Sequence, residues 1–264
     1  MDEYSLQTIL ADLPIPAIQH FKITGSTNDI AMAWCETNAA DGSLVVADTQ
    51  TSGRGRLGRR WITEEGSALA FSLLLRPTPA ETRHLGLFSA LAGLAVSQAL
   101  KNDFDLDAEI KWPNDVLLKR RKVCGILTEA VWRGSLLSGL IVGIGINIAP
   151  SSVPPDKELL FPATSIEQEL GNSVEMSQFL HSVLTSFFVW RPHLGDSVFF
   201  QAWEKHLAFF GEWVQVKTGF AANQEDSIGQ IIGISSKGNL RLRSASGEEL
   251  QVTVGDVHLR LVHE

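Results

Sequence analysis

The chain has 264 residues, of which 44% are hydrophobic and 20% charged, and its formal net charge at pH 7 is −8. This composition excludes a disordered or fibrous protein, and the length favours one large domain, alone or with one small domain. The acidic balance argues against broad nucleic-acid binding, which usually shows as a high isoelectric point or a long basic stripe.

The N-terminus is acidic and lacks the basic and apolar regions of a secretory signal or a transit peptide. The longest nearly apolar run, residues 139–149, is shorter than the roughly 18 residues that a membrane helix needs. Cys35 and Cys124 stand among apolar neighbours, which indicates reduced, buried thiols, and the seven histidines show no metal-ligand spacing. We therefore expect a cytoplasmic protein without a membrane segment or a zinc site.

The first part of the sequence alternates between strands and helices. Residues 18–25 predict a strand, after which Ser26 or Thr27 can cap a helix that runs to residue 36. Residues 43–50 and 67–77 predict buried strands on either side of an arginine- and glycine-rich stretch. Apolar residues at helical spacing over residues 80–102 predict the longest helix, and its glycines indicate close packing on a sheet.

The second part of the sequence groups strands and helices separately. Residues 108–150 predict a meander of antiparallel strands, and three helical segments are expected between Thr164 and Phe210. After Gly211 the pattern changes to short strands that suggest a small five-stranded barrel. The fold class is therefore α+β, with a catalytic or binding domain over residues 1–210 and a second domain over residues 211–264.

The stretch from Thr51 to Trp61, TSGRGRLGRRW, holds four arginines and three glycines in an acidic chain, which points to an anion site. Its glycines formally match the dinucleotide fingerprint GxGxxG, but that fingerprint opens a helix and here the pattern continues as loop and strand. Positive charge must then come from the arginine side chains on a glycine-hinged lid. A solvated loop that pairs with Glu64 and Glu65, or a nucleic-acid contact, stays open at this point.

Three further motifs combine polar residues with strand ends. KWPND places Lys111 and Asp115 at adjacent strand ends, where they form either a plain turn or a pocket in which lysine meets phosphate and aspartate orients it or holds magnesium. In KVCGIL, alternation turns Lys122 away from the solvated hairpin tip, and Gly125 permits close approach to the backbone. In GIGIN, Asn147 caps the strand or reads a base or sugar edge.

Taken together, these motifs resemble those of biotin protein ligases. GRGRLGRRW is similar to the adenylate-binding loop GRGRxGRxW of that family, and STN, KWPND, KVCGI and GIGIN follow in the family's order over nearly the whole chain. The resemblance implies a mixed sheet flanked by helices, like the catalytic domain of class II synthetases, with an SH3-like β-barrel at the end. It also implies that ATP activates biotin to biotinyl-5′-AMP, from which biotin passes to a carrier lysine with release of AMP.

The resemblance assigns roles to residues by their place in the motifs. The biotin head group is expected to meet the side chains of Ser26, Thr27, Asn28 and Gln50. Around the carboxylate and phosphate we expect Gly53, Arg54, Gly55, Arg56, Lys122, Gly125 and Asn147. The catalytic groups are expected to be Arg56, Lys111, Asp115 and Lys122, and Trp61 is either an anchor of the loop or an ordinary core residue.

The expected substrates are ATP and biotin, with Mg²⁺ near Asp115, and the expected partner is a biotin carboxyl carrier domain of a biotin-dependent carboxylase. A homodimer stays open, because family dimers often pair through edge strands. Only 25 residues precede Ser26, which leaves no room for the DNA-binding winged helix of some members, so we expect no DNA binding. A lipoate or octanoate ligase is the alternative enzyme, although its arginine-arginine-glycine motif is missing, and an RNA-binding module is disfavoured by the charge and the single tyrosine.

Overall fold

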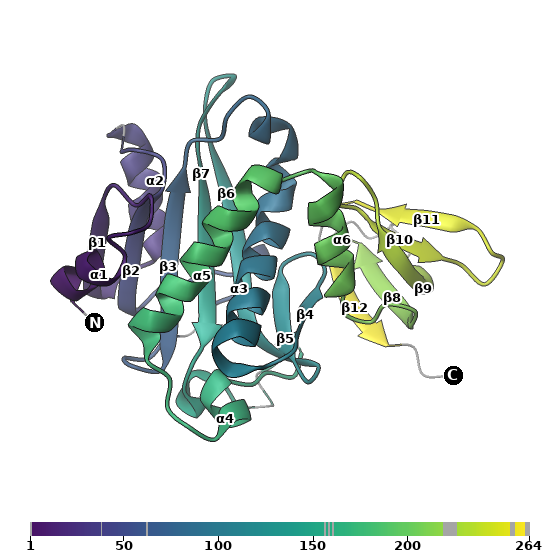
Figure 1. The fold of residues 1–264 in the computed structure, drawn as a ribbon. Coiled ribbons are helices and arrows are strands. Elements are labelled where there is room, and N and C mark those ends of the chain that lie inside the picture. The colour runs from purple at the N-terminus through teal and green to yellow at the C-terminus, as the bar shows by residue number, and fades with distance from the viewer. Residues whose placement is uncertain are drawn as a thin grey trace.

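A computed structural model describes residues 2–37, 39–61, 63–155, 157, 159, 161–218, 226–253 and 257–261. Its centre is a seven-stranded sheet in the order β1-β2-β3-β7-β6-β5-β4, shown in Figure 1. Only the neighbours β1 and β2 run parallel in this sheet, so the mixed sheet is confirmed. The strands are β1 (Ile18–Thr24), β2 (Ser43–Gln50), β3 (Ala68–Leu75), β4 (Ala108–Lys111), β5 (Asp115–Leu118), β6 (Arg121–Arg133) and β7 (Leu136–Asn147).

Helices cover both faces of this sheet. The helices are α1 (Glu3–Ile9), α2 (Thr27–Glu36), α3 (Phe88–Phe104), α4 (Ile166–Leu170), α5 (Met176–Trp190) and α6 (Ser197–Lys205). α3 and α5 pack against one face in the main core, whereas α2 packs with Val45, Leu74 and Ile141 on the other. Burial on both faces explains why all residues of β3 are buried and why the strand is apolar apart from Ser72.

The helix predicted over residues 80–102 begins later than expected, at Phe88. A 3-10 helix, Glu81–Leu87, precedes α3, and His84 leaves helical geometry at φ −125° and ψ 24°. The Glu81 carboxylate accepts from the backbone N–H of Thr78 at 2.7 Å and from Arg191 Nε at 2.7 Å, which fixes the tighter turn. Within α3, a Cβ on Gly93 would lie 3.4 Å from Ile110 of β4, so the predicted close packing on the sheet is confirmed.

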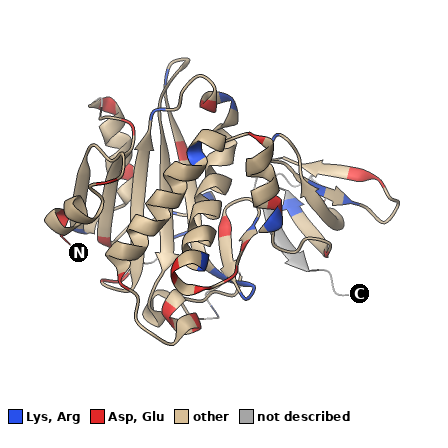
Figure 2. Cartoon of the chain, viewed as in Figure 1, with Lys and Arg blue, Asp and Glu red and all other residues tan. Residues whose placement is uncertain are grey.

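The helix α1 was not predicted; Asp2 caps it by accepting from the backbone N–H of Ser5 at 2.8 Å. Cys35 and Cys124 are both free and buried, as predicted. Figure 2 shows acidic and basic residues interspersed along the chain, with the middle of the central strands largely without charge. Among the described residues, no helix combines the length and apolar character needed to cross a membrane.

A second, antiparallel sheet follows α6, in the order β11-β10-β9-β8-β12. Its strands are β8 (Trp213–Thr218), β9 (Ser227–Ile234), β10 (Leu240–Arg243), β11 (Glu249–Val252) and β12 (Val257–Leu261). The five predicted strands are therefore present, in a sheet compatible with an SH3-like domain. The division of the chain at residues 210 and 211 stays a prediction.

The small sheet and the segment before it are tied to the edge of the large sheet. Trp112 Nε1 donates to the carbonyl of Gly238 at 2.9 Å, in the turn between β9 and β10. The backbone N–H of Ile110 donates to the carbonyl of His206 at 2.6 Å, and that of Ala208 to the carbonyl of Ile110 at 3.0 Å. Residues from the C-terminal part of the chain therefore hold β4 and the turn that follows it in place.

The side of α5 that faces the core gives a direct test of the packing. Phe187 is fully buried there, whereas Val189 on the same helix is 61% exposed. We expect Phe187→Ala to lower the free energy of unfolding by about 3–5 kcal/mol, because the cavity left behind cannot fully collapse. Val189→Ala should stay within about 0.5 kcal/mol of the unchanged protein. Urea denaturation followed by circular dichroism measures both, and equal effects would contradict this packing.

Candidate active site

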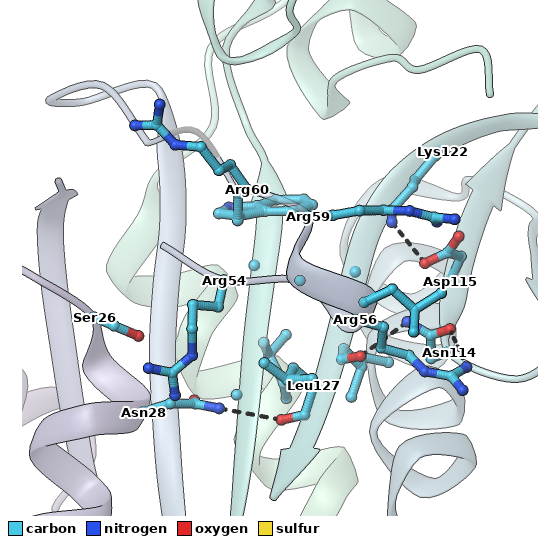
Figure 3. Close-up of a pocket in the computed structure, with 18 of the residues that line it drawn as sticks. Ser26, Asn28, Arg54, Arg56, Arg59, Arg60, Asn114, Asp115, Lys122 and Leu127 are labelled. Atoms are coloured by element: carbon cyan, nitrogen blue, oxygen red, sulfur yellow. Dashed lines mark hydrogen bonds and ion pairs between the residues drawn. The ribbon is translucent and has the colours of Figure 1, made fainter. Parts of the chain in front are cut away.

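A cavity of about 130 Å³ opens where α2, the arginine loop, the turn between β4 and β5, and the strands β6 and β7 meet. Figure 3 shows the arginine loop lying over the sheet, with Arg54 and Arg56 pointing down towards it and Arg60 pointing away. The predicted site residues that line the cavity are Ser26, Thr27, Asn28, Gln50, Arg54, Gly55, Arg56, Lys111, Asp115, Lys122 and Gly125. The structure thus brings together residues from six separate segments of the sequence.

Gly53 and Asn147 are the predicted site residues that stand apart from this lining in the described structure. Gly53 lies at the base of the loop, where a Cβ would lie 2.4 Å from the carbonyl oxygen of Trp61, so that only glycine fits. Asn147, at the end of β7, is 5% exposed and its amide nitrogen donates to the carbonyl of Thr164 at 3.0 Å. Both residues support the backbone around the cavity, and their contact with a ligand stays a prediction.

One end of the cavity is lined by hydroxyl and amide groups. Ser26 stands at the N-cap position of α2, as predicted, but its side chain makes no capping hydrogen bond. The backbone N–H of Thr27 donates to Gln50 Oε1 at 2.8 Å, and the Thr27 hydroxyl lies 3.1 Å from the same oxygen. Behind them Ser72, fully buried in β3, lies 2.7 Å from Thr27 Oγ1 and 2.6 Å from Asn28 Oδ1. This end suits a ligand rich in hydrogen-bonding groups.

The floor of the cavity is made of backbone, because glycines face it. Gly125 of β6 pairs with Gly145 of β7, and Gly143 lies two residues before Gly145 on the same face. A Cβ would lie 2.4 Å from the Trp61 ring at Gly145 and 2.1 Å from Asn28 Oδ1 at Gly143. The glycines therefore let the Trp61 ring and the Asn28 amide lie directly on the strands.

The arginine loop is folded as a small hairpin. Arg54 bridges to Arg60, and the backbone N–H of Trp61 donates to the carbonyl of Gly53 at 2.9 Å. At its tip Leu57 and Gly58 take left-handed conformations, with φ of 63° and 70°. Trp61 lines the cavity at the base of this hairpin, which matches the predicted anchor, and within the described residues its buried Nε1 has no acceptor.

Two arginines tie the loop to the body of the protein. Arg54 forms ion pairs with Asp29 of α2 and, at 3.0 Å, with Glu129 of β6. Arg56 Nη1 donates to Asn114 Oδ1 at 3.2 Å, and the Asn114 amide in turn donates to the carbonyl of Ile126 at 3.0 Å (Figure 3). The loop in this state is therefore closed over the sheet, held by contacts at both of its sides.

The other end of the cavity carries cations around one carboxylate. Asp115 Oδ1 lies 2.7 Å from Lys122 Nζ, and Asp115 Oδ2 lies 3.6 Å from Lys111 Nζ. Burial lowers the pKa of Lys111; Asp115 opposes this shift, and the charge of Lys122 adds to it. Burial by itself raises the pKa of Asp115, but Lys122 and Lys111 outweigh it and hold that pKa below its ordinary value. The Phe161 ring centroid lies 4.6 Å from Lys111 Nζ.

The neighbouring hairpin tip lies on the surface, as predicted, but its cations are paired. Lys119 and Arg120 occupy the turn in left-handed conformations, with φ of 47° and 61°. Lys119 and Arg121 both pair with Glu169, whose side chain is only 2% exposed, and Arg120 pairs with Glu212. Lys122, the next residue, points the other way, towards Asp115, as strand alternation predicts.

Sequence reasoning missed several residues of the site. The sequence predicts Ser72 only as part of an apolar strand, because its signal is a single hydroxyl within a fully buried run. Gly143 and Gly145 belong to the motif GIGIN, but the motif alone does not indicate that both face the cavity. Asp29 and Glu129, which hold Arg54, carried no motif that could have separated them from surface acids.

The pocket has hydroxyl and amide groups at one end, a flat floor, and cations at the other under a closable loop. Together with the mixed sheet, this arrangement is typical of a class of proteins that bind a small ligand with hydrogen-bonding groups at one end and an anionic group at the other. Among the described residues, no three His, Cys, Asp or Glu side chains gather in a possible metal site.

Comparison with known proteins narrows this class. A model of the biotin/lipoate A/B protein ligase family matches residues 20–147. The chain is 34% identical to the biotin–[acetyl-CoA-carboxylase] ligase of Paracoccus denitrificans, over 86% of this chain and 94% of that protein. It is 32% identical to the bifunctional ligase/repressor BirA of Bacillus spizizenii, over 85% of this chain and 69% of that protein. The biotin protein ligase from Aquifex aeolicus, solved in complex with biotin and ATP, aligns with a TM-score of 0.80 and 31% identity, over 94% of this chain and 100% of that one.

The chain therefore belongs to the biotin protein ligase family.

Asp115 provides a test of the electrostatics at the cation end. We expect Asp115→Asn to lower the free energy of unfolding at pH 7 by about 3–5 kcal/mol, because it leaves two ammonium groups facing each other without their carboxylate. The pKa of Asp115 is lowered in the folded state, so this contribution is complete above the ordinary carboxyl pKa and is lost as the pH falls through the lowered value.

Urea denaturation between pH 7 and pH 2 measures this difference, which should shrink towards the acid end. Asp105→Asn is the matched control, because Asp105 pairs with Lys101 on the surface with its side chain 88% exposed. A difference between the Asp115 variant and the unchanged protein that did not depend on pH would contradict the lowered pKa.

Proposed function

We propose that the protein is an ATP-dependent biotin protein ligase, which makes biotinyl-5′-AMP and transfers biotin to a lysine of a carrier protein. The observation that carries this proposal is the pocket with two unlike ends on a glycine floor. Biotin has the matching shape, because a cyclic urea with N–H and C=O groups stands at one end and a carboxylate at the other. The relatives named above are ligases of this kind.

In the first step a carboxylate oxygen of biotin attacks the α-phosphorus of ATP, and pyrophosphate leaves. Two anions have to meet, so positive charge must neutralise both and stabilise the charge that develops in transfer. We assign this work to Arg56 and Lys122, which line the same part of the cavity, and to Lys111 beside them. Asp115 keeps the two lysine ammonium groups apart and in place, with its carboxylate between them.

The donor set at this end also bears on magnesium. Mg²⁺ is commonly held by one or two carboxylates together with substrate phosphates, where it neutralises phosphate oxygens. Asp115 is the carboxylate among the described cavity-lining residues, and both of its oxygens face lysines. Because both oxygens of Asp115 already face ammonium groups, this arrangement fits an ion carried by the phosphates of ATP near Asp115.

The product of the first step is a mixed anhydride that water would hydrolyse. We propose that the arginine loop closes over it, with Trp61 packed on Gly145 and Arg56 on the anionic centre. In the second step an uncharged lysine amine attacks the acyl carbon, an amide bond forms, the bond to phosphate breaks and AMP leaves. The proposed acceptor is a biotin carboxyl carrier domain of a biotin-dependent carboxylase.

Three further parts of the proposal concern the setting of the enzyme. The free thiols of Cys35 and Cys124 support a reducing compartment such as the cytoplasm. The strand β1 stands at one edge of the large sheet, whereas the other edge strand, β4, is already hydrogen-bonded to residues 206–208. A homodimer through the β1 edge is proposed as its assembly. Lipoate or octanoate as the acid is not favoured, because the relatives named above are biotin ligases.

Exchange between ATP and labelled pyrophosphate tests the activation step directly. With purified protein and Mg²⁺, we expect exchange with biotin and none with lipoate or octanoate, because only biotin offers hydrogen-bonding groups to the hydroxyl and amide end. Chelation of Mg²⁺ should abolish the exchange. Exchange that depended on lipoate would indicate a lipoate ligase instead. No exchange with any of the three acids would contradict the proposal.

Retention of the intermediate tests the role of Arg56. We expect Arg56→Ala to release biotinyl-5′-AMP roughly 10- to 100-fold faster, since a charge-assisted hydrogen bond contributes about 1.5–3 kcal/mol. Release of labelled intermediate from the protein, followed by rapid filtration, measures the rate. Arg133→Ala is the control, because Arg133 is exposed at the far end of β6. Unchanged release from the Arg56 variant would remove this role.

A further inference from the structure

The hydroxyl and amide end of the cavity depends on a residue that the proposed mechanism does not use. Ser72 is fully buried in the middle of β3, and its hydroxyl lies behind the first turn of α2. It contacts Thr27 Oγ1 at 2.7 Å and Asn28 Oδ1 at 2.6 Å. Thr27 and Asn28 line the cavity, whereas Ser72 does not, so any effect of Ser72 on a ligand passes through these two neighbours.

The orientation of both amides in this network is fixed by their partners. Glu129 Oε2 lies 2.7 Å from the Asn28 amide, and a carboxylate only accepts, so the amide nitrogen must face it. The amide oxygen of Asn28 therefore faces Ser72. The backbone N–H of Thr27 only donates, so the amide oxygen of Gln50 must face Thr27, at 2.8 Å.

The hydroxyl hydrogens can then be placed one by one. Asn28 Oδ1 can only accept, so the single hydrogen of Ser72 goes to it, and Ser72 Oγ becomes an acceptor towards Thr27. The hydrogen of Thr27 has two acceptors, Ser72 Oγ at 2.7 Å and Gln50 Oε1 at 3.1 Å, and the shorter contact is to Ser72. The hydrogen of Thr27 therefore goes to Ser72, and Thr27 Oγ1 offers a ligand only its lone pairs.

Glu129 terminates this chain of hydrogen bonds. Its carboxylate accepts from the Asn28 amide at 2.7 Å and from Arg54 Nη2 at 3.0 Å, with the glutamate side chain 29% exposed. Donation therefore runs in one direction, from Thr27 through Ser72 and Asn28 to the carboxylate. Such a chain is polarised, because each donor strengthens the next.

We propose that Ser72 and Glu129 are positioning residues that hold the Thr27 hydroxyl as a hydrogen-bond acceptor for a ring N–H of the substrate. The inference rests on the proposed function, because the cyclic urea of biotin supplies that N–H. This acceptor role of Thr27 would let the site discriminate in favour of a ring with N–H donors. A ring that offers only acceptors at this end would face the lone pairs of Thr27 and bind less well.

The test compares two acids in ATP–pyrophosphate exchange: biotin, and its cyclic carbonate analogue, in which oxygen replaces both ring N–H groups. We expect Ser72→Ala to raise the KM for biotin about 10-fold with kcat within about 2-fold, because the phosphate end is untouched. The KM for the carbonate should stay unchanged, so that discrimination between the two acids falls about 10-fold. Glu129→Gln, which keeps the size of the side chain, should reduce the same ratio if Ser72→Ala does not fold.

Ser97→Ala is the matched control, because Ser97 is an equally buried serine whose hydroxyl donates to the carbonyl of Gly93 within α3. It should leave both KM values unchanged. A parallel rise of the KM for biotin and for the carbonate would show a merely structural role and overturn the inference, as would no change in either. Failure of the unchanged protein to exchange with biotin would instead remove the proposed function, and that measurement comes first.

Discussion

The site depends on the absence of side chains at the centre of the sheet. Gly143 and Gly145 of β7, with Gly125 beside them on β6, leave bare backbone on one face, and any Cβ at Gly143 or Gly145 would overlap Asn28 or Trp61. The Asn28 amide can then rest on the strands, and the arginine loop can close with Trp61 as its base. The cavity is thus a space left free by glycine, with the helix α2 and the loop as its walls.

The second constraint is the balance of charge around that space. Three of the cations around it are held by particular acidic partners: Arg54 by Asp29 and Glu129, and both lysines by Asp115. Glu129 links the closed arginine loop to the hydroxyl and amide end of the cavity, because its carboxylate accepts hydrogen bonds from both Arg54 and Asn28. The two ends of the pocket are therefore parts of one connected network.

Much of this could be predicted from the sequence, because the strongest signals are local. Hydrophobic runs gave the strands around the arginine loop, and the motifs at Lys111, Asp115 and Lys122 identified the cation end. What could not be predicted depends on contacts between distant residues. Glu129 lies 101 positions from Asn28 along the chain, and no spacing rule relates the two. Ser72 was hidden for the opposite reason, since one small hydroxyl hardly interrupts a buried strand.

The bond between the indole of Trp112 and the carbonyl of Gly238 has a consequence for how such a protein can diverge. Trp112 lies just before Asn114 and Asp115, so the bond to Gly238 lets the small sheet hold this turn in place. Gly238 is constrained as well, because its φ of 81° favours glycine and a Cβ there would also lie 2.5 Å from Leu87. Over evolutionary time these positions can vary only as a set, whereas exposed positions of the same sheet, such as Ile228, are free to drift and to adapt to new surroundings.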